Sequence, residues 1–418
     1  MRDWYVWRGG ASGGRPPNNW ESVFGGPAWT LDERTGQWYY HAFYSEQPDL
    51  NWRNPAVEAR MHAVLKFWLE RGVDGFRLDA VSALYEDPEL RDNPPLAAPR
   101  VTLTGVVSQE RLHNRRPDEV LDALQRVRQF VDRNGRDAVL ISEAYLDSVD
   151  ELVPFYGRNG DDGMHLPFNF FLAQVPSLDA PLFRRAVEDV ETACRGRWPS
   201  LVLSNHDVRR ACDRLADASQ ADACAKLLAM LLLTLRGTPF IYYGEEIAMR
   251  TEAPRRLDEV LDPVGRRFWP EYKGRDGVRR PMPWTADAGH GFTHATPWLG
   301  FPADAASRNV AAQTGDGRSV LETYRALLRA RANSEALRSG DYRSLDSAPS
   351  VFAYTRRADA SSAVVALNMS DRVVERALAD GPTNFVHGRA AVGTHRHQGE
   401  AVDLARLGLL PLEGLVIV

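Results

Sequence analysis

Short apolar runs and longer helix-like stretches alternate along most of the chain. Four apolar runs end on polar residues, and they read GVDGFRLD (72–79), AVLISEAY (138–145), SLVLSNHD (200–207) and TPFIYYGEE (238–246). Stretches with helical spacing lie between them, at 117–135 and 221–237. This alternation is typical of a parallel sheet covered by helices. Polar residues at the ends of several strands favour a (β/α)8 TIM-type barrel. A doubly wound sheet is the alternative, but no Gly-rich phosphate loop follows any of these runs.

The two ends of the chain have different patterns. Residues 1–50 are rich in Gly, Pro, Asn and Trp without a sustained period, which indicates loops with tight turns. A helix is expected next, with Asn54 as its N-cap, Pro55 at its first position and Gly72 at its end. From about residue 339 short β runs (SVFAYTRR, SAVVALNMS, GLVIV) predict a C-terminal antiparallel β-domain, preceded by a helix over 320–333.

Composition limits the class of protein. With 418 residues, 44% of them hydrophobic, the chain is long enough for one large domain and a smaller one. A net charge of −5 with mixed signs favours neither nucleic acid nor a membrane surface as partner. The longest apolar run, 227–235, is too short to span a bilayer. Cys194, Cys212 and Cys224 lack metal-ligand spacing and fit reduced thiols. We therefore expect a cytoplasmic protein without a cofactor or a metal site.

Three acidic residues at strand ends carry the candidate chemistry. They are Asp79, Glu143 and Asp207. Glycoside hydrolysis needs two carboxylates that face each other across a pocket. Arg77 precedes Asp79 by two residues, so it points to the same side of the strand and can hold that carboxylate ionised. His206 can donate to sugar hydroxyls, and Asp207 can bind them more tightly as positive charge develops.

A structural role is the alternative for each acid taken alone. A single Asp at a strand end is more often a helix cap or part of an ion pair, and Glu143 can pair with an arginine. Four such strand ends in one chain make that interpretation weaker. For Glu245 and Glu246, which follow the fourth run, a structural role is favoured.

Several segments resemble a known family. GFRLDAV, ISEAY and LSNHD resemble three of the four signature segments of the α-amylase superfamily, glycoside hydrolase family thirteen, in the order of that family. Segments such as PPNNWESVFGG, HLPFNFFL, GTPFIYYGEEIAM and GRDGVRRPMPW resemble its α-glucosidase and oligo-1,6-glucosidase branch. The resemblance implies that Asp79 is the nucleophile, Glu143 the acid/base and Asp207 the stabiliser of the transition state.

The resemblance also implies substrate-binding residues. Arg77 is expected to orient the nucleophile, and His206 to bind the sugar in the −1 subsite. Arg279, in GVRRPMPW, matches a family arginine that helps to close the non-reducing end of that subsite. In this branch the residue after the nucleophile is often Val in α-1,6-cleaving members and Ala or Thr in α-1,4-preferring ones. Ala80 therefore favours α-1,4 links.

The resemblance gives the domains and leaves one part without a counterpart. Residues 1–50 match the remainder of a loop-rich domain inserted after barrel strand three, 51–338 strands four to eight of the barrel, and 339–418 a C-terminal β-sandwich domain. Strands one to three and the family's metal loop have no counterpart, so an incomplete barrel is expected. Three explanations for these missing strands are open. The gene model is truncated, the N-terminal part is encoded separately and acts as a partner, or the gene is a decaying pseudogene.

The expected activity is retaining hydrolysis of terminal α-glucosidic bonds in short oligosaccharides. A transglycosylase or isomerase of the trehalose or isomaltulose synthase type is the nearest alternative. An inactive fragment, or a non-catalytic binding member like the transporter-associated heavy chains, is the alternative from another class.

Overall fold

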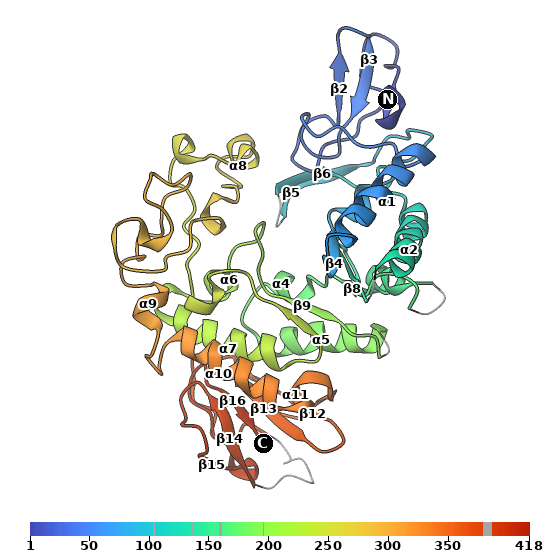
Figure 1. Ribbon diagram of the computed structural model, residues 1–418. Helices are drawn as coiled ribbons and strands as arrows, with labels where there is room; N and C mark the ends of the chain where they lie inside the picture. Colours follow the sequence, from blue (N-terminus) through green and yellow to red (C-terminus); the bar gives the residue numbers. More distant parts are fainter. Residues whose placement is uncertain (103–104, 136, 159–160, 195, 379–386) are drawn as a thin grey trace. The chain divides into compact units, whose positions relative to one another are not determined.

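The computed structural model describes residues 1–102, 105–135, 137–158, 161–194, 196–378 and 387–418. The chain divides into two compact units (Figure 1). Unit 1 comprises Met1–Phe168 and Pro254–Gly274, and unit 2 comprises Asn169–Ala253 and Arg275–Val418. Within the described ranges, the helices are all too short or too polar to cross a membrane.

Unit 1 contains a three-stranded sheet with the order β4-β7-β8, whose strands are all parallel. Apolar side chains of α2, such as Leu124 and Val131, pack with Leu140 of β7 in its core. The helices and strands of unit 1 are β1 Trp7–Arg8, β2 Trp29–Asp32, β3 Gln37–Tyr40, α1 Pro55–Leu69, β4 Gly75–Leu78, β5 Pro95–Thr102, β6 Gly105–Gln109, α2 Pro117–Asn134, β7 Val139–Ser142, α3 Val149–Leu152, β8 Leu166–Pro167 and α8 Pro263–Arg267.

Helix α1 begins where the sequence predicts. The Asn54 side chain accepts a hydrogen bond from the backbone N–H of Ala56 at 3.0 Å, and Pro55 occupies the first helical position. The helix lies beside α2 (Figure 1). Of its apolar positions only Val57 is fully buried, whereas Phe67 and Trp68 are nearly half exposed.

Unit 2 contains a second parallel pair, β9 with β10, and a C-terminal antiparallel sheet with the order β11-β12-β13-β16-β14-β15. Helices α7 and α10 lie side by side against this sheet (Figure 1). The elements of unit 2 are α4 Phe171–Gln174, α5 Ala180–Cys194, β9 Ser200–Val202, α6 Ala211–Leu215, α7 Ala221–Thr234, β10 Thr238–Phe240, α9 Val310–Gln313, α10 Val320–Asn333, α11 Glu335–Ser339, β11 Asp341–Ser344, β12 Val351–Arg357, β13 Ser362–Asn368, β14 His387–Gly393, β15 Ala401–Asp403 and β16 Gly414–Ile417.

A buried arginine joins α7 to the C-terminal sheet. The Arg356 guanidinium is fully buried and donates to the backbone carbonyls of Thr234 (2.6 Å) and Gly340 (2.8 Å). The Thr234 hydroxyl also hydrogen-bonds the Tyr354 hydroxyl at 2.6 Å. Because these polar groups are paired, their hydrogen bonds offset part of the cost of burial, which also lowers the pKa of Arg356 to about 10.

The predicted parallel strands therefore all form, but they belong to two sheets, β4-β7-β8 and β9-β10. After β8, the Asn169 backbone N–H donates a hydrogen bond to the Ser200 hydroxyl at 2.9 Å. The predicted C-terminal antiparallel sheet is confirmed. The absence of barrel strands one to three and the three domain boundaries stay predictions.

Candidate active site

Two of the predicted acids lie next to each other in unit 1 because of the register of its sheet. Leu78 of β4 is paired with Ser142 of β7 in a parallel ladder. The next residues, Asp79 and Glu143, therefore leave the sheet at the same edge. The backbone ties this edge together, since the Glu143 N–H donates to the Leu78 carbonyl at 2.9 Å.

The Arg77 guanidinium binds both carboxylates. Its Nη1 lies 2.5 Å from Asp79 Oδ1, and its Nη2 lies 3.0 Å from Glu143 Oε2. The side chain also lies over the ring of Phe168, with 5.7 Å from Cζ to the ring centroid. A planar guanidinium held on two sides fixes the relative position of the two acids.

The two acids differ sharply in environment. The Asp79 side chain is 72% exposed, whereas that of Glu143 is 7% exposed. Burial raises the pKa of Glu143 to about 7, and the nearby Asp79 carboxylate adds to the rise, while Arg77 and the Ala80 N–H oppose it. Two neighbouring carboxyls in different environments are suited to separate roles, one ionised and one holding a proton near neutral pH.

Ala80 occupies a strained backbone conformation between the two acids. Its φ of 46° lies in the left-handed region, which is costly for a residue with a Cβ. In this conformation its N–H donates to Glu143 Oε2 at 3.1 Å. The turn thus holds the Glu143 carboxyl, which the sequence-based interpretation of Ala80 as a linkage determinant did not anticipate.

The third predicted acid, Asp207, lies in unit 2 within a cluster of cations. Its Oδ1 accepts hydrogen bonds from Arg279 Nη2 (2.8 Å) and Arg275 Nη1 (3.2 Å). His206 Nε2 lies 3.4 Å from Asp207 Oδ2, and Arg279 Nε donates to the His206 carbonyl at 2.8 Å. The turn is fixed by Asn205, whose side-chain oxygen accepts from the Asp207 N–H at 2.9 Å. His206, Asp207 and Arg279 therefore contact one another in unit 2, and their role in sugar binding stays a prediction.

Sequence reasoning missed Arg275. It lies four residues before Arg279 in the segment GRDGVRRPMPW, and its side chain is only 11% exposed. In the sequence, Arg275 is a basic residue near the start of a short helix-like turn, and no pattern there indicates that it binds Asp207. Two cations on one carboxylate hold it ionised and oriented.

Glu245 is held by hydrogen bonds within unit 2, and its structural role stays a prediction. Its carboxyl is buried and accepts hydrogen bonds from the Ser204 hydroxyl (2.5 Å) and the Tyr242 N–H (3.1 Å). Burial raises its pKa to about 7. It thereby links the end of β10 to the loop that leads to Asp207. In the described part of the chain no group of three or more His, Cys, Asp or Glu side chains has the arrangement of a metal site.

The structure thus groups Arg77, Asp79, Ala80 and Glu143 in unit 1, and His206, Asp207 and Arg279 in unit 2. That the two groups meet around one sugar stays a prediction, as do the individual roles.

Comparison with known proteins identifies the class. The model of the α-amylase catalytic domain matches residues 1–340. The chain therefore belongs to the α-amylase family and is a glycoside hydrolase. Within the family it belongs to the α-glucosidase and oligo-1,6-glucosidase branch.

Three similar proteins show the extent of the similarity. A probable α-glucosidase of Rhizobium meliloti is 39% identical over 90% of this chain and 69% of its own length. An oligo-1,6-glucosidase of Parageobacillus thermoglucosidasius is 31% identical over 91% of this chain and 71% of its own length. The crystal structure of the α-glucosyl transfer enzyme XgtA superposes with a TM-score of 0.87 at 34% identity, covering 99% of this chain and 77% of that protein.

Proposed function

We propose that the protein is a retaining α-glucosidase that removes terminal α-glucosyl units from short oligosaccharides, with a preference for α-1,4 links. One observation carries this proposal: a single guanidinium holds an exposed carboxylate, Asp79, beside a buried carboxyl, Glu143, whose pKa is raised to about 7. That asymmetry suits a nucleophile and a general acid.

The reaction proceeds in two displacements. Asp79 attacks the anomeric carbon while Glu143 donates its proton to the departing glycosidic oxygen, which gives a glucosyl ester on Asp79. The ionised Glu143 then takes a proton from water, the water oxygen attacks the anomeric carbon, and Asp79 leaves as a carboxylate. Asp207, held by Arg275 and Arg279, binds sugar hydroxyls more tightly as positive charge develops on the ring.

Glucosyl transfer is the second candidate function. It is favoured by the similarity to XgtA, which is described as an α-glucosyl transfer enzyme. Both reactions form the same glucosyl ester and differ only in whether water or a sugar hydroxyl accepts the glucosyl group. The ratio of glucose to transfer products from maltose and from sucrose distinguishes them.

Two substrates with different leaving groups test the roles of Asp79 and Glu143 separately. Asp79→Asn should abolish turnover of both methyl α-glucoside and 2,4-dinitrophenyl α-glucoside, because both need the nucleophile. Glu143→Gln should lower formation of the glucosyl ester by about 10²-fold or more for methyl α-glucoside and much less for the dinitrophenyl glucoside, whose leaving oxygen needs little protonation.

The matched control is Asp74→Asn, at the opposite end of the same strand and exposed. It should keep the activity of the parent chain. Normal turnover by Asp79→Asn, or equal losses on both substrates for Glu143→Gln, contradicts the assigned roles.

A further inference from the structure

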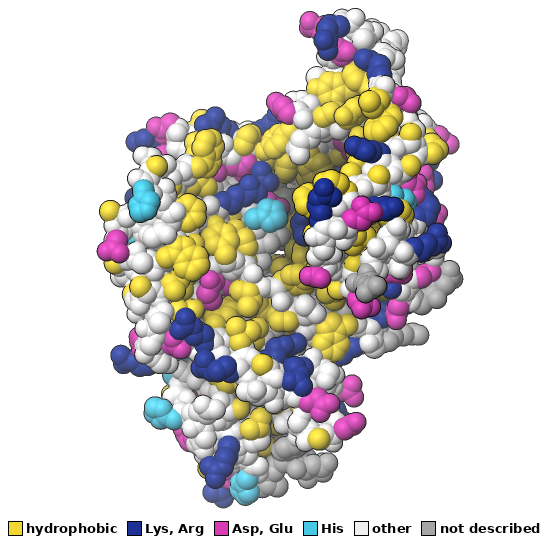
Figure 2. All heavy atoms as spheres, viewed as in Figure 1, with side chains coloured by type: hydrophobic (Ala, Val, Ile, Leu, Met, Phe, Trp, Pro, Cys, Tyr) yellow, Lys and Arg dark blue, Asp and Glu magenta, His cyan; other side chains and the backbone are white. Residues whose placement is uncertain are grey.

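A buried arginine in unit 2 connects the two segments that carry Asp207 and Arg279. Arg210 is 1% exposed and follows Asp207 by three residues. Figure 2 shows Lys and Arg side chains spread over the face of the molecule that it draws, where water solvates them. A buried guanidinium has lost that solvation, so the groups that replace the water indicate what the residue does.

The groups around the Arg210 guanidinium are neutral. Its Nη1 donates to the Tyr243 carbonyl at 2.7 Å, and its Nη2 donates to the Val278 carbonyl at 3.3 Å. Its Cζ lies 5.0 Å from the ring centroid of Tyr242 and 5.1 Å from that of Tyr243. Among the described residues no carboxylate forms an ion pair with Arg210. Two carbonyls and two aromatic rings therefore stand in for an anion.

The carbonyls on both sides of Arg279 are held by this group of side chains. The Val278 carbonyl accepts from the Tyr242 hydroxyl at 3.0 Å and from the buried guanidinium, so both of its lone pairs are used. The Tyr243 hydroxyl has one proton, and the nearer of the two carbonyls in its reach is that of Arg280, at 2.7 Å. The backbone of Arg279 is thereby fixed before and after its Cα.

The ion pair of Arg279 and Asp207 depends on that backbone. The Arg279 side chain is 35% exposed and that of Asp207 15%, so water reaches the pair. A pair that water reaches gains little free energy and holds its own geometry weakly. Arg210 joins the same two segments on the buried side, because it lies in the turn after Asp207 and bonds to the carbonyl before Arg279.

Burial alone does not mark a residue of this kind. Arg356 is equally buried, but its guanidinium donates to the carbonyls of Thr234 and Gly340, where α7 meets the C-terminal sheet. The partners distinguish the two arginines, since only those of Arg210 include a neighbour of Arg279 in the chain.

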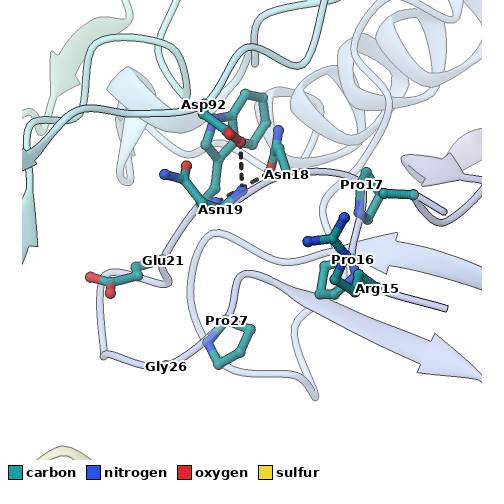
Figure 3. Close-up of a pocket in the computed structure, with 11 residues that line it drawn as sticks. Arg15, Pro16, Pro17, Asn18, Asn19, Glu21, Gly26, Pro27 and Asp92 are labelled. Carbon is teal, nitrogen blue, oxygen red and sulfur yellow. Dashed lines mark hydrogen bonds between the residues drawn. The ribbon is translucent and has the colours of Figure 1, made fainter. Parts of the chain in front are cut away.

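Neutral side chains are able to join two loops elsewhere in the chain. A hollow of about 480 Å³ in unit 1 is lined by prolines, Trp20 and polar side chains (Figure 3). The Asn19 N–H donates to the exposed Asp92 carboxylate at 2.9 Å, and the Asn19 side chain donates to the Asn93 carbonyl at 2.9 Å. Figure 3 shows Asp92 turned towards Asn19. An amide and an exposed carboxylate suffice there, whereas a buried charge joins the segments of Asp207 and Arg279.

We propose that Arg210, Tyr242 and Tyr243 are positioning residues that hold the backbone on both sides of Arg279 and so keep its guanidinium on Asp207. They act through Arg279 and not on the sugar itself. Their effect on the reaction rests on the proposed function, whereas the hold on the backbone does not need turnover.

Hydrogen–deuterium exchange of the full chain tests the hold on the backbone. The probes are the Val278 and Arg279 N–H groups, which make backbone hydrogen bonds of 3.1 and 3.2 Å in a short turn. The double variant Tyr242→Phe/Tyr243→Phe keeps both rings and removes both hydroxyls. In this variant the two amides should exchange about tenfold faster than in the parent, because local opening costs less free energy.

Steady-state kinetics on maltose test the consequence for the reaction. The double variant should lose about tenfold in kcat with little change in KM, because Asp207 is expected to bind the ring most tightly in the transition state. Arg210→Met should lose a similar factor, and Arg210→Lys less, since an ammonium can still donate to one carbonyl. These losses should disappear in an Arg279→Met background, where no guanidinium is left to position.

Arg356→Met is the matched control, because it removes an equally buried arginine from the same unit. It should keep the exchange rates of the Val278 and Arg279 amides and the kcat of the folded parent. Thermal midpoints check that each variant is folded.

Unchanged exchange of the two amides in the double variant overturns the proposal, as does an equal loss of kcat in the parent and in the Arg279→Met background. Faster exchange in a chain whose parent does not hydrolyse maltose supports the hold on Arg279 and counts only against the proposed function. Hydrolysis by the parent with unchanged exchange and kcat in the variants supports that function and refutes the positioning role.

Discussion

At the scale of single residues, the division of labour between Asp79 and Glu143 has a simple physical origin. Both carboxyls contact Arg77, but only Glu143 is buried. Burial disfavours the charged form more than one shared guanidinium favours it, so the pKa of Glu143 rises to about 7. Spacing in the sequence can predict that the two acids are neighbours, but not which of them is desolvated.

The first prediction concerns the pH profile. Glu143 must carry a proton to act as the acid, so kcat/KM should fall about tenfold per pH unit above about pH 7. Arg77→Met removes the charge that opposes this rise in the pKa, so the alkaline limb should move to higher pH and activity should fall. The measurement is kcat/KM for maltose from pH 5 to 9, because its sugar leaving group needs the proton. If the alkaline limb of the pH profile lies at the same pH in Arg77→Met and in the parent, Arg77 does not lower the pKa of Glu143.

At the scale of elements, the close approach of β4 and β7 positions this pair of acids. Gly75 begins β4 with a φ of 157°, and a Cβ added there would lie 2.1 Å from the Val139 carbonyl oxygen. Real Cβ atoms do not approach backbone so closely, so only glycine allows the parallel pairing of Gly75 with Val139.

We therefore expect Gly75→Ala to push the strands apart at their start. The cost should be about 3 kcal/mol of stability, at the upper end for overpacking, since the obstacle is backbone. The activity of Gly75→Ala should fall more than that of a variant with a substitution on the surface. The control is Gly36→Ala, a turn glycine with open space around its Cβ position. Its own φ of 66° adds some strain, so it measures the backbone effect alone. Equal urea midpoints for the two variants would contradict this explanation.

Local pattern could predict most elements, because helix caps and apolar periods act within a few residues. Such local signals predicted the start of α1 at Pro55 and the strands β4, β7, β9 and β10. The exposure of Phe67 and Trp68 did not follow from their helical spacing, since burial depends on what packs against the helix. Arg275 was missed for the same reason, because its role depends on the position of Asp207, far away in the sequence.

At the scale of the whole molecule, several buried acids make stability depend on pH. Burial raises the pKa of Asp49 to about 7 in unit 1, as it does for Glu245 in unit 2. The folded chain therefore holds protons that the unfolded chain has released, so these groups make stability fall as pH rises from about 4 to about 7. Histidines such as His41 and His62, whose pKa burial lowers, act in the opposite direction around their usual value. The net slope of the parent chain thus mixes two effects of opposite sign.

A comparison with Asp49→Asn isolates one of them. The amide oxygen can still accept the hydrogen bond that the Ala42 N–H donates to Asp49 at 2.6 Å, but it has no charge to desolvate. Near pH 4 the free energies of unfolding of parent and variant should be closest, because above that pH the unfolded chain releases the Asp49 proton that the folded chain still holds. At pH 8 the variant should be more stable by about 2 kcal/mol, a value reduced from the full shift because the group is partly exposed. Urea unfolding at both pH values measures the difference, with the exposed Asp74→Asn as control. If the difference in the free energy of unfolding stays constant from pH 5 to 8, Asp49 is ionised throughout that range. Burial then does not raise the pKa of Asp49.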